Sequence, residues 1–111
     1  MSFLDSFSPR KRLLKRFSNY LKSNYLILDV RTPQEFEAGS IPEAVNIPFE
    51  VLYEHLPQLN KDSNIILFCR SGNRSRYAKD LLNQHGFKSV WDAGGMENLN
   101  ELISEIKLLK K

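Results

Sequence analysis

Short apolar runs alternate along this chain with segments in which apolar residues recur every three or four positions. The short runs are strand candidates at 25–28, 44–47, 65–68 and 88–91. The periodic segments predict helices at about 9–22, 33–38, 49–56 and 74–85, and a closing helix that ends near 109. This alternation is typical of an α/β domain with a parallel sheet. The run 65–68 is the most apolar, so we expect it at the centre of the sheet.

Capping residues mark the ends of these helices. Ser8-Pro9 supplies an N-cap and a first-turn proline, and Thr32-Pro33-Gln34-Glu35 fits a capping box. Gly39 and Gly86 follow helix candidates, where a glycine can adopt the backbone conformation that ends a helix. Residues 92–95 are predicted to form a turn. The helix at 74–85 is expected to share one apolar face among Tyr77, Ala78, Leu81 and Leu82.

Length and composition narrow the class of protein. With 111 residues the chain forms one domain. No apolar run approaches the ~20 residues that a membrane helix needs, and residues 1–10 lack the pattern of a secretory signal. A single cysteine excludes an intramolecular disulfide and a cysteine-based zinc site. We therefore expect a cytoplasmic protein, in a compartment where a free thiol persists.

Positive charge is concentrated at the N-terminus. Residues 1–22 carry a net charge of +5, whereas residues 23–111 carry −2. A basic segment of this kind suits nucleic acid, an anionic membrane or an acidic partner. The alternative is a solvated helix face, because an apolar stripe in the same segment can pack on the body of the domain. We favour this alternative, since no aromatic platform for nucleic acid is interleaved with the basic residues; the expected partners include neither nucleic acid nor membrane.

The only cysteine lies in a polar loop between a strand and a helix. The run is Cys69-Arg70-Ser71-Gly72-Asn73-Arg74, with Ser75 following. Unsatisfied amide groups at the helix N-terminus and two flanking arginines favour the thiolate over the thiol. Gly72 allows the loop to turn its N–H groups inward. A buried structural cysteine is the alternative, but a loop with two arginines is a poor environment for an inert core thiol.

This loop resembles the active-site loop of the rhodanese family of sulfurtransferases, C-R-x-G-x-R-S/T. A second stretch, from Asp29-Val30-Arg31 through Glu35-Phe36 and Gly39 to Ile47-Pro48, resembles the family's upstream signature, and Gly94-Gly95 resembles its turn before the last helix. The resemblance covers about residues 18–109, with 1–17 as a basic segment that forms a packed helix. The chain departs from the family pattern at Ser40, Glu43 and Met96. The fold implied is a three-layer α/β domain with a mostly parallel sheet of about five strands.

The resemblance also implies a reaction. Cys69 would attack the outer sulfur of a donor such as thiosulfate and become a persulfide. Cyanide in vitro, or a thiol or sulfur-carrier protein in the cell, would then remove that sulfur. No cofactor or metal is implied, and the chain is expected to be a monomer or a homodimer.

The implied site consists of a nucleophile, a binding loop and supporting residues. Cys69 is the nucleophile, and the loop that would bind substrate and persulfide comprises Arg70, Ser71, Gly72, Asn73 and Arg74. Supporting roles fall to Asp29, Arg31, Glu35 and Ser75. We expect Arg70 to contact the anionic group of the donor and Ser75 to cap the helix. Arg31 either pairs with Glu35 or contacts substrate, and Asp29 is expected to bond the loop amides or Arg74. His55 and His85 are expected to lie outside the site.

Two other functions remain open at this stage. Cysteine phosphatases also combine a cysteine, a glycine-bearing loop and an arginine, but five residues separate their cysteine from their arginine. Only four separate Cys69 from Arg74, and a shorter loop fits a single sulfur atom better than a tetrahedral phosphate. The second alternative is a non-catalytic rhodanese-like module or a sulfur carrier, although such modules usually lack the cysteine.

Overall fold

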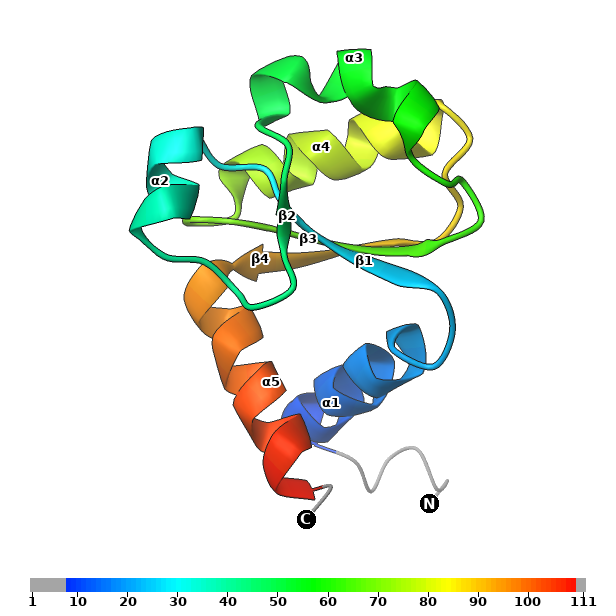
Figure 1. The fold of residues 1–111 in the computed structure, drawn as a ribbon. Helices are drawn as coiled ribbons and strands as arrows, with labels where there is room; N and C mark the ends of the chain where they lie inside the picture. The colour runs from blue at the N-terminus through cyan, green and yellow to red at the C-terminus, as the bar shows by residue number, and fades with distance from the viewer. Residues whose placement is uncertain (1–7, 110–111) are drawn as a thin grey trace.

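A parallel sheet of four strands in the order β2-β1-β3-β4 runs through the molecule (Figure 1). The computed structural model describes residues 8–109, so the part of the predicted basic segment that falls on 1–7 lies outside the described residues. The strands are β1 (Tyr25–Asp29), β2 (Val45–Asn46), β3 (Asn64–Cys69) and β4 (Val90–Gly95). The predicted α/β class and the central position of the most apolar strand are confirmed.

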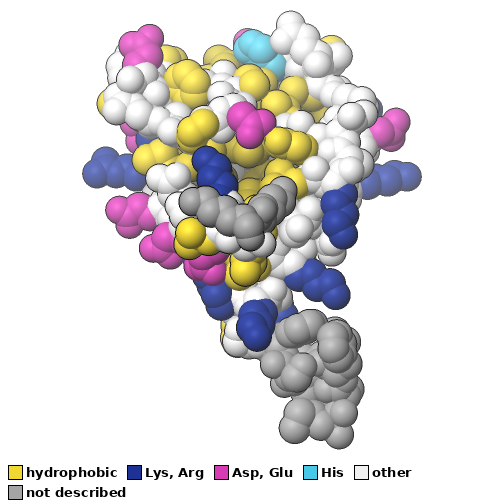
Figure 2. All heavy atoms as spheres, turned by 60° about the horizontal axis from the view of Figure 1, so that its bottom comes forward, with side chains coloured by type: hydrophobic (Ala, Val, Ile, Leu, Met, Phe, Trp, Pro, Cys, Tyr) yellow, Lys and Arg dark blue, Asp and Glu magenta, His cyan; other side chains and the backbone are white. Residues whose placement is uncertain are grey.

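Helices cover both faces of the sheet (Figure 1). One face carries α2 (Pro33–Ala38), α3 (Leu52–His55) and α4 (Asn73–Gln84), and 3-10 turns at Phe49–Val51 and Leu56–Gln58 flank α3. The other face carries α1 (Pro9–Tyr20) and α5 (Met96–Leu109), which Figure 2 turns toward the viewer. Within residues 8–109, no helix is long and apolar enough to cross a membrane.

The alternation of side chains along β3 creates a separate apolar core on each face. Ile65, Leu67 and Cys69 pack with the α3 and α4 side, and Ile66 and Phe68 pack with the α1 and α5 side. All five are buried. Because successive side chains of a strand point to opposite faces, one buried strand serves both layers and holds the cysteine rigidly at its end.

The predicted caps are confirmed. Ser8 caps α1, with Pro9 at its first position. Thr32 and Glu35 form the capping box of α2, which ends at Gly39, where φ is +145°.

Several predicted elements were wrong in detail. Within residues 8–109 the sheet has the four strands that the apolar runs predicted, rather than the roughly five that the family resemblance implied. The predicted turn at 92–95 continues β4, with a register irregularity opposite Leu67–Cys69. The helix predicted at 49–56 is interrupted by 3-10 turns. Tyr77, expected on the buried face of α4, is 55% exposed.

The carboxyl ends of β1, β3 and β4 lie at the same edge of the sheet. Asp29, Cys69 and Gly95 are the last residues of these strands. Ligands of open parallel sheets bind beyond this edge. The fold therefore brings together the three stretches that resemble rhodanese motifs.

Candidate active site around Cys69

Two glycines of β4 allow the cysteine loop to lie directly against the sheet. A Cβ atom built on Gly95 would lie 2.9 Å from the carbonyl oxygen of Arg70, which is too close for any side chain. Gly72 has φ of +101°, a conformation that favours glycine, and its missing Cβ would lie 3.7 Å from Gly94 Cα. Gly94-Gly95 is therefore a packing surface for the loop, a role that the predicted turn did not include.

The Cys69 thiol is enclosed by its own loop. The amide of Gly72 donates to Sγ at 2.9 Å. The thiol donates to Ser75 Oγ at 3.5 Å, and that hydroxyl donates to the Gly72 carbonyl at 3.2 Å. Once the sulfur is ionised, the hydroxyl can turn and donate to it instead. Cys69 is only 1% exposed. The expected capping role of Ser75 was wrong, because Gly72 is the N-cap of α4 and no side chain caps this helix. Ser75 instead contacts the sulfur directly.

The pKa of Cys69 lies below the ordinary value for a thiol. Burial alone would raise this pKa, but the Ser75 hydroxyl and the backbone amides of Ser75, Gly72 and Ser71 together lower it by more. Hydrogen bonds to the sulfur stabilise the anion and so favour ionisation. The sequence predicted that helix-end amides and arginines would favour the thiolate. In the structure the groups that lower the pKa are the amides and the Ser75 hydroxyl.

We expect the pH dependence of Cys69 alkylation to show this shift. The rate with iodoacetamide should reach half its maximum at a pH clearly below the ~8.5 of an ordinary cysteine. Ser75→Ala should move the midpoint upward, because it removes a group that stabilises the anion, whereas Ser89→Ala, remote from the loop, should not. A wild-type midpoint at or above that of free cysteine would contradict the assignment.

A bidentate ion pair joins α2 to the first turn of α4. Arg74 donates to the two carboxylate oxygens of Glu35 at 2.9 and 3.2 Å. Glu35 also accepts from the Thr32 amide as part of the capping box. The Arg74 guanidinium, followed by the Thr32 amide, lowers the pKa of Glu35 to about 2. The pair between Arg31 and Glu35, one of the two alternatives for Arg31, is not formed, and Glu35 instead fixes Arg74 in the first turn of the helix behind the loop.

This ion pair predicts a stability effect that depends on pH. Because the pKa of Glu35 is lower in the folded protein, its contribution is complete above the unfolded value, ~4.3, and is lost as the pH falls toward about 2. Glu35→Gln should lower the free energy of unfolding by about 1 kcal/mol at pH 7, since the pair is partly solvated. The difference in unfolding free energy between wild type and Glu35→Gln should shrink as the pH falls from about 5 to about 2. Urea unfolding of both proteins across this pH range measures it. A difference that stays constant across this range would contradict the prediction, and Glu37→Gln, on the exposed side of α2, is the matched control.

A second ion pair is fully buried at the end of β1. Arg31 contacts Asp29 through Nη2–Oδ2 at 2.7 Å and Nε–Oδ1 at 2.9 Å, and Asp29 is 0% exposed. The same guanidinium donates to the Gly39 carbonyl at 2.7 Å, and Ser40 Oγ donates to Asp29 at 2.8 Å. The hydrogen bonds that Arg31 donates to Asp29 have the largest part in raising the pKa of Arg31. The expected bond from Asp29 to the loop amides or Arg74 was therefore wrong.

Asn46 completes this network. Its side-chain amide donates to the carbonyls of Asp29 and Arg31 at 2.9 and 3.0 Å. Sequence analysis gave Asn46 no role, although it lies within the stretch that resembles the upstream signature. Asn46 thus fixes the segment that joins β1 to α2, and α2 is the helix that carries Glu35.

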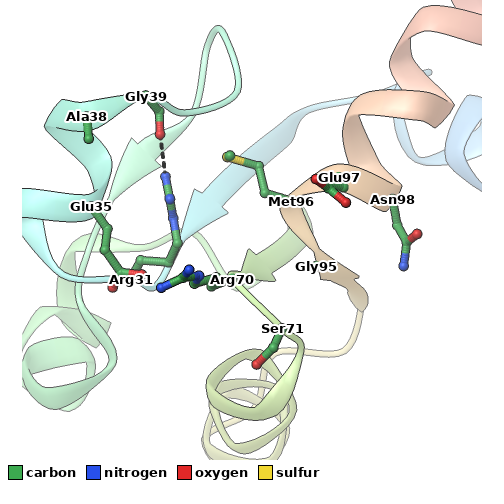
Figure 3. A pocket seen from close by; sticks show the side chains of 10 residues that line it. All are labelled: Arg31, Glu35, Ala38, Gly39, Arg70, Ser71, Gly95, Met96, Glu97 and Asn98. Carbon is green, nitrogen blue, oxygen red and sulfur yellow. Dashed lines mark hydrogen bonds between the residues drawn. The ribbon is translucent and has the colours of Figure 1, made fainter.

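A cleft of about 710 Å³ lies beside the cysteine loop (Figure 3). Its lining comprises Arg31, Glu35, Ala38, Gly39, Arg70, Ser71, Gly95, Met96, Glu97 and Asn98. In Figure 3 the Arg31 side chain points to the Gly39 carbonyl, and the first turn of α5 forms the opposite wall. Arg70 is exposed, whereas Arg31 is held by its carboxylate partner. Arg70 is therefore the arginine of this lining best placed to meet a solute.

The remaining predicted residues occupy the edges of the site. Asn73 is exposed at the first position of α4. His55 contacts the Val51 carbonyl at 2.9 Å, and the His85 ring lies 5.4 Å from that of Tyr53; neither lines the cleft. Ala38, Glu97 and Asn98 were not predicted, because they carry no motif signal and reach the cleft only through the fold. Among residues 8–109, no cluster of three His, Cys, Asp or Glu side chains could hold a metal ion.

The family model and the relatives that match this chain agree with the resemblance found in the sequence. The model of the rhodanese-like domain family matches residues 13–102. A sulfurtransferase from Allochromatium vinosum is 36% identical over 70 residues, which cover 63% of this chain and 65% of that protein. The adenylyltransferase and sulfurtransferase UBA4 of Saccharomyces cerevisiae is 40% identical over 84 residues, 66% of this chain but only 19% of the yeast protein. The chain thus spans about a fifth of the length of that relative.

A solved structure shows the same fold. The rhodanese-related protein from Thermoplasma volcanium superposes with a TM-score of 0.65 at 34% identity. The match covers 83% of this chain and 88% of that one.

Proposed function

The chain belongs to the rhodanese-like domain family, and we propose that it is a sulfurtransferase that carries a sulfane sulfur on Cys69. The observation that carries this proposal is the enclosure of Sγ, with the Gly72 amide at 2.9 Å and Ser75 Oγ at 3.5 Å. These groups favour the thiolate, which is the nucleophilic form of cysteine. Relatives named as sulfurtransferases support this proposal.

The proposed reaction has two displacement steps at sulfur. In the first, the Cys69 thiolate attacks the outer sulfur of thiosulfate and forms an S–S bond, while the bond inside thiosulfate breaks and sulfite leaves with its electron pair. In the second, a nucleophile attacks the outer sulfur of the persulfide, and the Cys69 thiolate leaves. With cyanide as the acceptor the product is thiocyanate. Electrons balance within each step, so the cycle needs no external oxidant.

The loop stabilises the negative charge of Cys69 both as the free thiolate and as the persulfide. Backbone amides that already point at the sulfur stabilise an anion without reorganisation. A persulfide extends the side chain by one S–S bond, about 2.05 Å, so its outer sulfur would begin to project from the ring of amides. The first turn of α4 is held by the pair between Glu35 and Arg74, which keeps the ring in place during the cycle.

The burial of Cys69 favours a narrow reacting group. With the residue 1% exposed, a donor must present an atom that can enter the loop. A terminal sulfur meets this requirement better than a tetrahedral phosphate with four oxygens. The four-residue interval between Cys69 and Arg74 supports the same choice of sulfur transfer over phosphatase activity.

Arg70 is proposed to bind the anionic end of the donor. Arg70→Ala should raise KM for thiosulfate about tenfold, equivalent to the loss of one charge-assisted hydrogen bond of about 1.4 kcal/mol. Because Arg70 is exposed, the melting temperature should change little. Arg76→Ala, an exposed arginine of α4 outside the cleft lining, is the matched control. A fall in melting temperature with unchanged kinetics would show that Arg70 is structural.

The proposed acceptors in the cell are a thiol or a sulfur-carrier protein, and the proposed setting is the cytoplasm. The named activity of the yeast relative belongs to a much longer protein, so it guides the choice of acceptor class only. A reducing compartment would keep the lone thiol available for the cycle.

The direct test is a substrate panel at fixed enzyme concentration. Thiosulfate with cyanide should yield thiocyanate at a rate proportional to enzyme, and an aryl phosphate should yield no phenol above the rate without enzyme. Turnover of the aryl phosphate without thiocyanate formation would overturn the proposal in favour of a phosphatase. If the protein turns over neither thiosulfate nor the aryl phosphate, and transfers no sulfur from an alkyl persulfide to a thiol, the proposal fails and the protein is a non-catalytic module.

A further inference from the structure

The solvent side of α1 is a continuous row of cations. Successive turns of this helix bring together positions three and four apart. Its exposed basic side chains are Lys11, Arg12, Lys15 and Arg16, and Lys22 is exposed just beyond its end. No acidic residue occurs between residues 8 and 28 of the sequence. The helix itself therefore contributes only positive charge to its solvent side, and the acidic side chains Glu101 and Glu105 reach it from α5 at Arg10.

The helix is held so that this row must face outward. Phe17, on its inner side, is 1% exposed and lies 5.8 Å from the Trp91 ring. Arg10 points toward α5 and pairs with Glu105, and it also lies 3.7 Å from Glu101. The inner side of α1 thus consists of core and ion-pair contacts, and the orientation of the outer cations follows from them.

Exposed leucines accompany the cations. Leu13 is 40% exposed and lines a shallow hollow with Arg12 and Arg16. Leu108 and Leu109, at the end of α5, are 67% and 70% exposed. Figure 2 shows Lys and Arg side chains projecting from the lower part of this view with hydrophobic side chains exposed beside them.

A groove of about 430 Å³ between α1 and α5 repeats this combination. Its apolar lining is Leu14, Ile106 and Leu109, and lysines 11, 15 and 22 stand along it. A ligand that fits such a surface has hydrocarbon and negative charge side by side. We refer to the exposed cations of residues 11–22, with Leu13, Leu108 and Leu109, as the basic face.

We propose that the basic face docks the protein on a lipid bilayer that carries anionic headgroups. The sequence alone favoured a solvated helix face without a membrane partner, and the exposed leucines beside the cations change that expectation. Clusters of four to eight Lys or Arg on an amphipathic helix bind acidic lipids, and neighbouring apolar side chains enter the boundary between headgroups and acyl chains. The cations are spread along the helix and do not converge on one point, which suits a continuous charged surface. This inference concerns where the protein binds and does not depend on its proposed reaction.

Two other anionic partners fit the basic face less well. Interfaces with proteins are depleted in lysine and enriched in aromatic side chains at their centre, whereas this face is rich in lysine and its exposed apolar residues are leucines. Single-stranded nucleic acid requires exposed aromatic side chains for base stacking, and exposed leucines give no advantage on phosphates. A bilayer uses both the cations and the leucines.

The fold leaves the cleft accessible in this arrangement. The cleft lies at the carboxyl ends of the strands, whereas the basic cations lie along α1, which packs under the sheet on the face opposite α2 and α4 (Figure 1). Residues 23–111 carry a net charge of −2. An anionic surface would repel this negatively charged part of the chain and attract α1, and the two effects together would orient the molecule.

Cosedimentation with vesicles tests the proposal. The full chain should bind vesicles of phosphatidylcholine and phosphatidylserine at ~3:1, should not bind phosphatidylcholine alone, and should be released between about 0.1 and 0.5 M salt. Arg12→Glu with Arg16→Glu should lower the partition coefficient about tenfold or more, because two cations leave the basic face. Arg76→Glu with Lys88→Glu changes the net charge equally at exposed positions outside the face and should retain wild-type binding.

Other outcomes are equally decisive. Equal binding to both vesicle types, no binding to either, or equal loss in the two double variants would overturn the proposal. Retention on an RNA column or by an acidic polypeptide, with no binding to vesicles, would assign the face to that partner instead. Circular dichroism melts of each variant separate lost binding from lost folding; if the glutamate variant unfolds, Arg12→Gln with Arg16→Gln serves in its place. Cys69→Ser should bind vesicles as wild type does, so a failure here is distinct from a failure of the proposed reaction.

Discussion

Cys69→Ser is expected to abolish thiocyanate formation from thiosulfate and cyanide, with a loss in kcat of about 10³-fold or more. A serine hydroxyl is not ionised under these conditions and is a far weaker nucleophile toward sulfur than a thiolate. The sulfur is buried and its loop contacts are short, so no other side chain of the loop can replace it in the attack.

The comparison requires that the variant stays folded. Serine is close in size to cysteine and can keep the contacts to the Gly72 amide and to Ser75, so the melting temperature should fall by only a few degrees. Steady-state rates measured alongside Arg76→Ala, with equal protein by absorbance, provide the test. Activity within tenfold of wild type would exclude Cys69 as the nucleophile.

Asp29→Ala is expected to have the largest effect on stability. Asp29 is 0% exposed and accepts hydrogen bonds from Arg31 and Ser40. Its removal leaves the Arg31 guanidinium, in a residue that is 5% exposed, with the Gly39 carbonyl as its hydrogen-bond acceptor and the Phe68 ring at 5.8 Å, but without a counter-charge in contact. Loss of one member of a buried ion pair costs about 3–5 kcal/mol, a large part of the ~5–15 kcal/mol that stabilises a typical domain.

Urea unfolding monitored by the fluorescence of Trp91 measures this effect. The double variant Asp29→Ala with Arg31→Ala should be less destabilised than the sum of the two single variants, because it leaves no unpaired buried charge. Additive losses, or a loss below about 1 kcal/mol for Asp29→Ala, would show that the pair contributes little. Glu37→Ala, at an exposed position of α2, should be close to wild type.

Local signals in the sequence predicted the parts of the site that depend on neighbouring residues. The capping box at Thr32–Glu35 follows from short-range hydrogen bonds, which residue type alone can specify. The helix behind Cys69 begins after Gly72 without a side-chain cap, one residue before the predicted start at Arg74. The apolar run ending at Cys69 sets the strand and thus the position of the thiol at the edge of the sheet.

The ion pairs could not be predicted in this way. Spacing of four residues suggested a pair between Arg31 and Glu35, but that rule holds within one helix, and Arg31 precedes the cap of α2. In the fold, Arg31 turns back to Asp29, and Glu35 reaches Arg74, which lies 39 residues away. Choices between such partners depend on how the fold places α2 relative to the first turn of α4.

The role of Gly94-Gly95 likewise depends on contacts between distant segments. Two consecutive glycines indicate a turn when only local structure is considered. The structure continues the strand through them, and Gly95 must be a glycine because the carbonyl of Arg70 occupies the space where a side chain would lie. A sequence carries no direct signal for such an approach between segments 25 residues apart.

The mass of the intact protein after exposure to thiosulfate tests the central proposal most directly. Wild-type protein should gain the mass of one sulfur atom, lose it on addition of cyanide, and regain it with fresh thiosulfate. Cys69→Ser should show no gain under the same conditions. An unchanged mass in the wild type, with thiosulfate or with an alkyl persulfide as donor, would contradict a persulfide on Cys69.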